Sequence, residues 1–244
     1  MIMNYHVNID MAKILEGPSF SIHNNPKKLI IMLHGYGDNA DNFIHLSKQI
    51  DQEDWGVNYI ALNAPNIIRS YPTGYQWFDL YPNGIYISEA GPQEIEIIKK
   101  DIKDSVLKIE QTIKFYIQKF NINLSDCIVL GFSQGGMMTF EFGNHVQDQL
   151  CALAILSGRI MNRNVNIFNS YLLNTPIFIS HGDKDDVLPI SNFNSSVEYL
   201  KKNRFNYESH IIKGDTHIIS SNTINLLQKF IKKKSMMKSI IILY

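Results

Sequence analysis

The chain alternates between short, mostly apolar runs and longer stretches in which apolar residues recur every three or four positions. The short runs occupy residues 28–34, 57–63, 126–132, 151–157, 176–182 and 206–212. Most of them are apolar throughout and do not alternate with polar residues, which is typical of strands covered on both faces. We therefore predict six strands buried in the interior of one sheet.

The stretches between these runs have the periodicity of amphipathic helices. They occupy residues 40–50, 92–120, 135–146, 190–203 and 220–234. In the longest one, Pro92 suits a first helical turn, and Glu94 complements the positive end of the helix dipole. Because strands and helices alternate, the order predicts an α/β fold: a mostly parallel central sheet with helices on both faces, joined by right-handed crossovers.

No internal repeat and no linker rich in glycine, serine or proline divides the 244 residues. We predict one domain at residues 1–233 and a tail at 234–244, where lysines precede a short apolar end. Residues 66–91 interrupt the regular pattern because prolines and glycines are spaced among aromatic residues. Loops of this length are often lids or binding loops, although an aromatic mini-core under the loop fits the same composition.

The charge and the cysteines restrict the partners and the compartment. Lys plus Arg and Asp plus Glu each number 23, so no overall field attracts nucleic acid. Cys127 and Cys151 each lie beside an apolar run, as buried thiols do in a reducing compartment. The N-terminus lacks the features of a secretory signal, and no window is apolar enough to span a membrane. We expect a cytoplasmic protein without stable membrane insertion.

The predicted strand at 126–132 leads into a helix through a serine between two glycines, Gly131-Phe-Ser133-Gln-Gly135. Gly-x-Ser-x-Gly at a strand-to-helix junction is the nucleophile elbow, in which a tight turn lifts the serine oxygen above the sheet. Glycines are needed there because a β-carbon would collide with neighbouring backbone. We predict that Ser133 is a nucleophile; a phosphate-binding loop or a plain tight turn is the alternative.

A serine hydroxyl needs a base, and hydrolases with this elbow place an acid and then a histidine later in the chain. His217 lies in a loop ahead of the last helix and is preferred over His210, which lies inside a predicted strand. Three aspartates directly after the strand at 176–182 are candidates for the acid, and the residues alone leave the choice open: Asp183, Asp185 and Asp186.

Five blocks of the sequence resemble the signatures of the phospholipase/carboxylesterase family of α/β-hydrolases, which includes the acyl-protein thioesterases. The blocks are LIIMLHGYGDNADNF, GYQWFDL, IVLGFSQGGMM, HGDKDDVLP and GDTHIIS. The resemblance extends from about residue 15 to residue 233. It implies an α/β-hydrolase fold and the activity of a serine esterase.

The resemblance also implies residue roles. The family's acid falls on Asp185 and its histidine on His217, and its oxyanion hole falls on the backbone N–H groups of Tyr36 and Gln134. Gln134 would be the first residue of a helix, where N–H groups are unpaired, which supports its assignment to the oxyanion hole. The residues implied beside the acyl pocket are Tyr75, Trp77, Phe78 and Leu188.

The implied reaction is hydrolysis of carboxylic esters or thioesters with apolar acyl groups through an acyl-enzyme, with no cofactor and no metal. A carboxylesterase, a lysophospholipase and an acyl-protein thioesterase all fit, so the candidate substrates are small-molecule or lipid esters and acylated proteins. A homodimer is a candidate assembly, since the family often dimerises. The alternative from another class is a catalytically silent α/β-hydrolase scaffold that binds a partner through the aromatic loop at 66–91.

Overall fold

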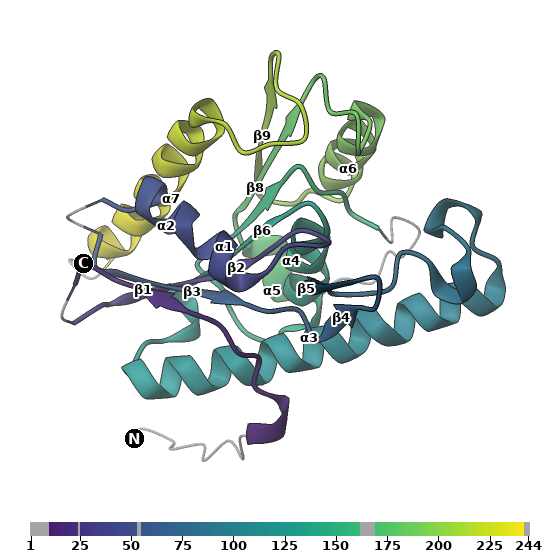
Figure 1. Ribbon diagram of the computed structural model, residues 1–244. Helices are drawn as coiled ribbons and strands as arrows, with labels where there is room; N and C mark the ends of the chain where they lie inside the picture. Colours follow the sequence, from purple (N-terminus) through teal and green to yellow (C-terminus); the bar gives the residue numbers. More distant parts are fainter. Residues whose placement is uncertain (1–9, 24, 53–54, 162–168, 242–244) are drawn as a thin grey trace.

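The computed structural model describes residues 10–23, 25–52, 55–161 and 169–241, with side chains in the last helix described up to residue 234 (Figure 1). Seven strands form one sheet in the order β1-β3-β2-β6-β7-β8-β9. They are β1 (Ser19–Phe20), β2 (Lys28–Leu33), β3 (Val57–Leu62), β6 (Cys127–Phe132), β7 (Ala152–Leu156), β8 (Ile177–Gly182) and β9 (Tyr207–Ile212). Among these seven described strands, only β1 runs antiparallel to its neighbour, β3. The predicted parallel sheet is confirmed, and its six strands agree with the predicted runs to within a residue at each end.

Helices cover both faces of the sheet, as predicted. The longer α-helices are α3 (Pro92–Phe120), α4 (Gln134–His145), α6 (Ile190–Lys202) and α7 (Ser221–Ile241), and the short ones are α1 (Ala40–Phe43), α2 (Ser47–Ile50) and α5 (Ser170–Asn174). Short 3-10 helices are η1 (Met11–Lys13), η2 (Ile44–Leu46), η3 (Pro82–Gly84), η4 (Ile87–Glu89) and η5 (Leu124–Asp126). The predicted domain boundary at 233 stays a prediction; α7 continues past it.

Alternation along the strands divides the core into two layers. On β2, Leu29, Ile31 and Leu33 join the cluster that contains residues of α3, α4, α5 and α6. Ile30 and Met32 point the other way, into the cluster that contains residues of α1, α2 and α7. All five side chains are fully buried, which is why the strand reads as an unbroken apolar run.

Two segments differ from the predictions. The helix predicted at 40–50 is divided into α1, η2 and α2. At the break the Ser47 hydroxyl donates to the Ile44 carbonyl, a bond that competes with regular helical hydrogen bonding. Residues 66–91 contain a hairpin of β4 (Asn66–Ile68) and β5 (Tyr71–Gln76), which the prolines and glycines obscured in the sequence.

The hairpin is attached to the loop that follows β2. The Gly37 amide donates to the Tyr75 carbonyl at 2.9 Å, and the Tyr75 amide donates to the Asp38 carbonyl at 2.9 Å. The segments that follow β2, β6, β8 and β9 leave the same edge of the sheet, because these strands are parallel. In open α/β sheets, sites form at this carboxyl edge.

Candidate active site

Ser133 lies between the end of β6 and the start of α4, with φ 54° and ψ −116°. A non-glycine residue with positive φ is strained, so the surrounding packing must hold it in place. A β-carbon on Gly131 would lie 2.1 Å from the Gly135 carbonyl oxygen, and one on Gly135 would lie 2.0 Å from the Leu33 carbonyl oxygen. The two glycines therefore permit the close contact of helix and strand that presents the serine.

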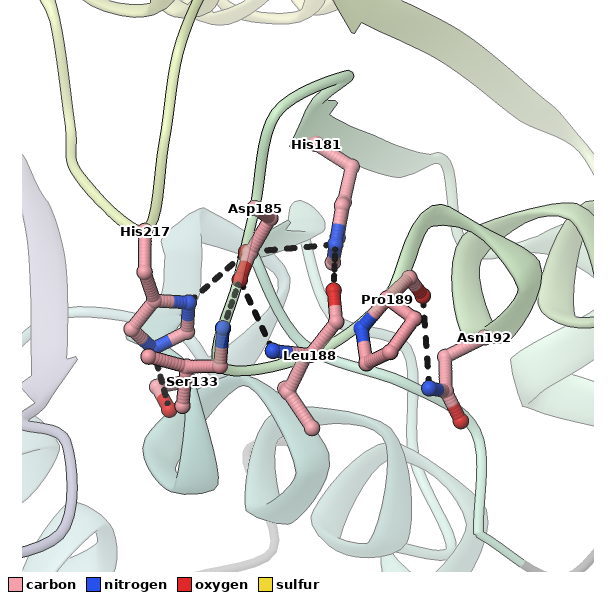
Figure 2. A network of polar contacts seen from close by, with 8 residues as sticks. Ser133, His181, Asp185, Leu188, Pro189, Asn192 and His217 are labelled. Atoms are coloured by element: carbon pink, nitrogen blue, oxygen red, sulfur yellow. Dashed lines mark hydrogen bonds and ion pairs between the residues drawn. The ribbon is translucent and has the colours of Figure 1, made fainter.

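The structure brings Ser133, Asp185 and His217 together, although they lie far apart in the sequence (Figure 2). His217 Nε2 is 2.9 Å from Ser133 Oγ, and His217 Nδ1 is 2.7 Å from Asp185 Oδ2. The Asp185 side chain has no exposed surface, whereas that of His217 is 15% exposed. A hydroxyl, an imidazole and a buried carboxylate in this order can transfer a proton away from the hydroxyl.

The other acid and histidine candidates lie elsewhere. Asp183 accepts a hydrogen bond from the Gly214 amide at 2.6 Å and braces a turn. Asp186 is exposed. His210 lies on β9, with its ring 5.2 Å from that of Phe178. Of the three aspartates that the residues left open, Asp185 is the one that is hydrogen-bonded to His217 among the described residues.

A cavity of about 240 Å³ opens at Ser133, and Tyr36, Gln134 and His217 all line it. No acceptor in the described part of the chain takes a hydrogen bond from the amide of Tyr36 or Gln134. Gln134 is the first residue of α4, where N–H groups have no helical partner. Both amides at this cavity are therefore available to a bound oxygen.

Only part of the predicted acyl-pocket set reaches this cavity. Leu188 lines it, together with Leu80, Tyr86, Ile87 and Met137.

Trp77 and Phe78 are fully buried and are absent from the lining of this cavity. Their backbones are instead held by the Gln134 side chain, whose Oε1 accepts from the Trp77 amide at 2.9 Å and whose Nε2 donates to the Phe78 carbonyl at 2.8 Å. Tyr75 is partly buried against the core, with its ring 6.3 Å from that of His34. In this structure these three aromatic residues pack against residues that form the site and do not line the cavity.

His34 fixes the loop that carries Tyr36. Its Nε2 accepts from the Ala64 amide at 3.1 Å, so the ring proton is on Nδ1, which donates to the Gly35 carbonyl at 2.7 Å. Burial lowers the pKa of the His34 imidazole, in keeping with this neutral tautomer. The Trp77 indole N–H donates to the His34 carbonyl at 2.9 Å. His34 is therefore a structural histidine at the start of the His-Gly turn.

A second hollow of about 740 Å³ lies between α3 and α4 and shares Ile87 and Arg159 with the Ser133 cavity. Its apolar lining comes from Ile87, Ile95, Ile98, Ile102, Val106 and Met161, and its polar lining from Lys99, Lys103, Glu141, Asn144, His145 and Arg159. Burial raises the pKa of the Glu141 carboxyl to about 7. Because two lining residues are shared, the hollow borders the cavity; we call it the α3–α4 groove.

The predicted set omitted His181, which precedes Gly182 in the same block that supplies Asp185. The His181 side chain has no exposed surface, and its Nε2 lies 2.7 Å from the Leu188 carbonyl oxygen and 3.2 Å from Asp185 Oδ2 (Figure 2). The His-Gly pair in the block HGDKDDVLP could have pointed to His181, but in the sequence this pair resembles the end of a strand.

Among the described residues, no cluster of three or more histidine, cysteine, aspartate or glutamate side chains is arranged to hold a metal ion. Within the same residues, no helix is both long enough and apolar enough to cross a bilayer.

The fold and the elbow define the class. A mostly parallel sheet flanked by helices, with a strained serine between β6 and α4, is the architecture of an α/β-hydrolase. The sequence description of the phospholipase/carboxylesterase family matches residues 20–235. This chain belongs to that family.

Relatives and solved structures agree with this assignment. The chain is 28% identical over 221 residues to acyl-protein thioesterase 1 of Saccharomyces cerevisiae, covering 85% of this chain and 92% of the relative. It is 27% identical over 209 residues to acyl-protein thioesterase 1 homolog 1 of Dictyostelium discoideum, covering 84% and 89%.

Among solved structures, esterase PE8 has a TM-score of 0.79 at 23% identity, covering 90% of this chain and 99% of that chain. SOBER1 of Arabidopsis thaliana has a TM-score of 0.71 at 20% identity, covering 85% and 98%. At these identities the structural likeness establishes the fold.

Proposed function

We propose that this protein is a serine hydrolase that cleaves carboxylic esters or thioesters through an acyl-enzyme, with Ser133, His217 and Asp185 as its catalytic residues. One observation carries the assignment: a single imidazole lies within hydrogen-bond distance of both the strained serine, at 2.9 Å, and the buried carboxylate, at 2.7 Å. Family membership supports the same class of reaction.

The steps follow from the positions of the two ring nitrogens. His217 Nε2 takes the proton from Ser133 Oγ as that oxygen attacks the substrate carbonyl carbon. Asp185 keeps the other ring proton on Nδ1 and stabilises the imidazolium that forms. His217 then gives the proton to the departing alcohol or thiol. Water, deprotonated by the same nitrogen, attacks the acyl-enzyme and releases the carboxylic acid. No step of this sequence calls for a cofactor.

The amides of Tyr36 and Gln134 are proposed to hold the carbonyl oxygen as it becomes negative. Both residues line the cavity with Ser133, and neither amide has another acceptor among the described residues. A donor in such a position contributes about 3 kcal/mol to transition-state stabilisation. Since only backbone groups are involved, the exposed Tyr36 ring can vary without loss of the donor.

The lining of the cavity supports an apolar acyl group as the bound part of the substrate. Leu188 and Met137 stand beside Ser133 in this cavity. Met137 and Glu141 follow Ser133 at intervals of four residues, so one side of α4 leads from the serine into the α3–α4 groove. Glu141 lies about 12 Å along the helix from Ser133. We infer that the chain of a long acyl group continues from the cavity into this groove.

Room for a long acyl chain, together with relatives named acyl-protein thioesterase 1, supports an S-acylated protein or a lipid ester as substrate. The cytoplasmic location stays a prediction that the two buried free thiols, Cys127 and Cys151, support. The homodimer also stays a prediction.

Covalent labelling with a fluorophosphonate probe tests the proposal. The probe should modify the wild-type protein at Ser133 and fail to modify Ser133→Ala, because only an activated hydroxyl attacks it. The matched control is Ser157→Ala, which removes another serine with positive φ at the end of a strand and should leave labelling intact. A well-folded wild-type protein that neither labels nor hydrolyses p-nitrophenyl esters would favour the silent scaffold that binds a partner.

A further inference from the structure

We propose that His181 is a positioning residue for the acid of this site: it holds the Leu188 carbonyl, and thereby fixes the turn whose amides orient the Asp185 carboxylate. The inference rests on the proposed function, because it gives His181 a role in the reaction of Ser133. Figure 2 shows His181 and His217 approaching the Asp185 carboxylate from two sides.

The contacts of His181 assign its tautomer. Its Nε2 lies 2.7 Å from the Leu188 carbonyl oxygen, which can only accept a hydrogen bond, so Nε2 carries a proton. Its Nδ1 is buried and has no hydrogen-bond partner among the described residues. A proton on Nδ1 would leave a buried donor unpaired, which is unfavourable. His181 therefore presents an Nε2 proton to the Leu188 carbonyl.

Leu188 links this histidine to the acid. Its carbonyl accepts from His181, and its amide donates to Asp185 Oδ1 at 2.8 Å. The Val187 amide donates to the same carboxylate oxygen at 3.0 Å. Both polar backbone groups of Leu188 are thus engaged, which fixes its orientation and leaves Asp185 Oδ2 directed at His217 Nδ1.

The turn needs such a fixed point because part of it is open to solvent. Val187 is 59% exposed, and Asp186 is exposed as well. On the inner side, His181 Nε2 lies 3.2 Å from Asp185 Oδ2, so the positive end of its N–H bond also faces the carboxylate. Loss of the His181 donor would leave the Leu188 carbonyl without this partner and allow the carboxylate to rotate away from His217.

Two substitutions test the hydrogen-bond donor of His181 and its ring independently. His181→Phe keeps a planar ring against Phe193, whose centroid is 5.8 Å away, but it has no donor. His181→Gln loses the ring and keeps a neutral N–H donor at a similar reach. We expect His181→Phe to lower kcat for p-nitrophenyl acetate by about 100-fold with little change in KM, because a small misplacement of a catalytic group has an effect of this size. His181→Gln should recover most of the lost activity.

The same comparison is repeated in an Asp185→Asn background. There His181→Phe should change kcat less than about 2-fold, because the group that it positions is already disabled. Equal activity of the Phe and Gln variants, or an undiminished effect of His181→Phe in the Asp185→Asn background, would overturn the inference. If circular dichroism shows that His181→Phe does not fold, His181→Met takes its place as a donor-free and adaptable side chain, with the same outcomes.

The positioning role of His181 and the proposed serine hydrolase function are refuted by different outcomes. Loss of labelling in Ser133→Ala together with normal kcat in His181→Phe would refute the positioning role and leave the serine hydrolase intact. Full activity of Ser133→Ala would refute the proposed function itself.

Discussion

The side chain of Gln134 is hydrogen-bonded to the backbone of Trp77 and Phe78. Its Oε1 accepts from the Trp77 amide at 2.9 Å, and its Nε2 donates to the Phe78 carbonyl at 2.8 Å. The same residue opens α4, with its backbone at the Ser133 cavity. Gln134 is 1% exposed, so these bonds form away from water. The segment after β5 and the nucleophile elbow are therefore joined by one buried amide.

Gln134→Ala should destabilise the protein. It leaves the Trp77 amide and the Phe78 carbonyl buried without their partners, at about 1–3 kcal/mol for each group. For the two groups together we expect a loss of about 2–6 kcal/mol in the free energy of unfolding, measured by urea denaturation. Gln147→Ala is the matched control, because Gln147 is exposed just beyond the same helix and should cost less than about 0.5 kcal/mol. Equal losses in the two variants would show that the buried amide does not join the two segments.

Asp185→Asn should reduce kcat by roughly 10⁴ while leaving the fold intact, by analogy with the serine-protease acid. An asparagine still accepts from the amides of Val187 and Leu188, but it no longer stabilises the charged His217 or its tautomer. Steady-state kinetics with p-nitrophenyl acetate measure the loss. The control is Asp186→Asn, an exposed neighbour in the same turn, which should retain near-normal kcat. Near-normal kcat in Asp185→Asn would move the acid role to Asp183 or Asp186.

The sheet could be predicted from the sequence because its physical cause is local. A strand covered on both faces needs apolar side chains at nearly every position, and the chain from Leu29 to Leu33 meets that need without interruption. The elbow could be predicted because its motif is local: a β-carbon on Gly131 would meet the Gly135 carbonyl within the same turn, although Gly135 itself is required by the Leu33 carbonyl of β2.

The surroundings of the site could not be predicted, because they depend on where distant segments meet. Trp77 and Phe78 carry apolar surface that suits either a pocket wall or a core, and the choice is made by the Gln134 side chain, a partner more than fifty residues away. In the sequence His181 resembles the end of a strand, and its role depends on the contact with Leu188 in the turn at 185–188. The hairpin of β4 and β5 was missed because Pro72 and Gly74 break its apolar alternation.

The α3–α4 groove predicts a change in chain-length preference. Ile95 lines the groove and is 41% exposed, whereas Ile97 on the same helix is 36% exposed and is absent from the lining. Ile95→Trp should lower kcat/KM for p-nitrophenyl dodecanoate at least 10-fold, because the indole occupies space that the acyl chain needs, and should leave the acetate rate unchanged. Ile97→Trp should leave both rates unchanged. Identical chain-length profiles in the two variants would mean that the acyl chain follows another route.

Glu141 links the groove to the pH dependence of stability. Glu141 lines the α3–α4 groove, and burial raises the pKa of its carboxyl from 4.5 to about 7. The positive groups of the groove, Lys99, Lys103 and Arg159, do not offset this burial. The charge of Glu141 is also felt by Tyr199, whose pKa is raised first by burial and then by this carboxylate.

The direction in which stability changes with pH follows from the number of protons that the folded and unfolded states bind. Between pH 4.5 and about 7 the folded protein keeps a proton on Glu141 that the unfolded chain has lost, so the stabilising contribution is present below pH 4.5 and disappears as the pH rises through about 7. Glu141→Gln, which is never charged, should therefore be more stable than wild type at pH 8 by up to about 3 kcal/mol, and the advantage should shrink toward zero at pH 4.5. Urea denaturation of both proteins at the two pH values measures this. Glu198→Gln, an exposed glutamate on α6, should show no such pH-dependent difference. An advantage of Glu141→Gln that is the same at both pH values would mean that the change in packing, and not the buried charge, accounts for it.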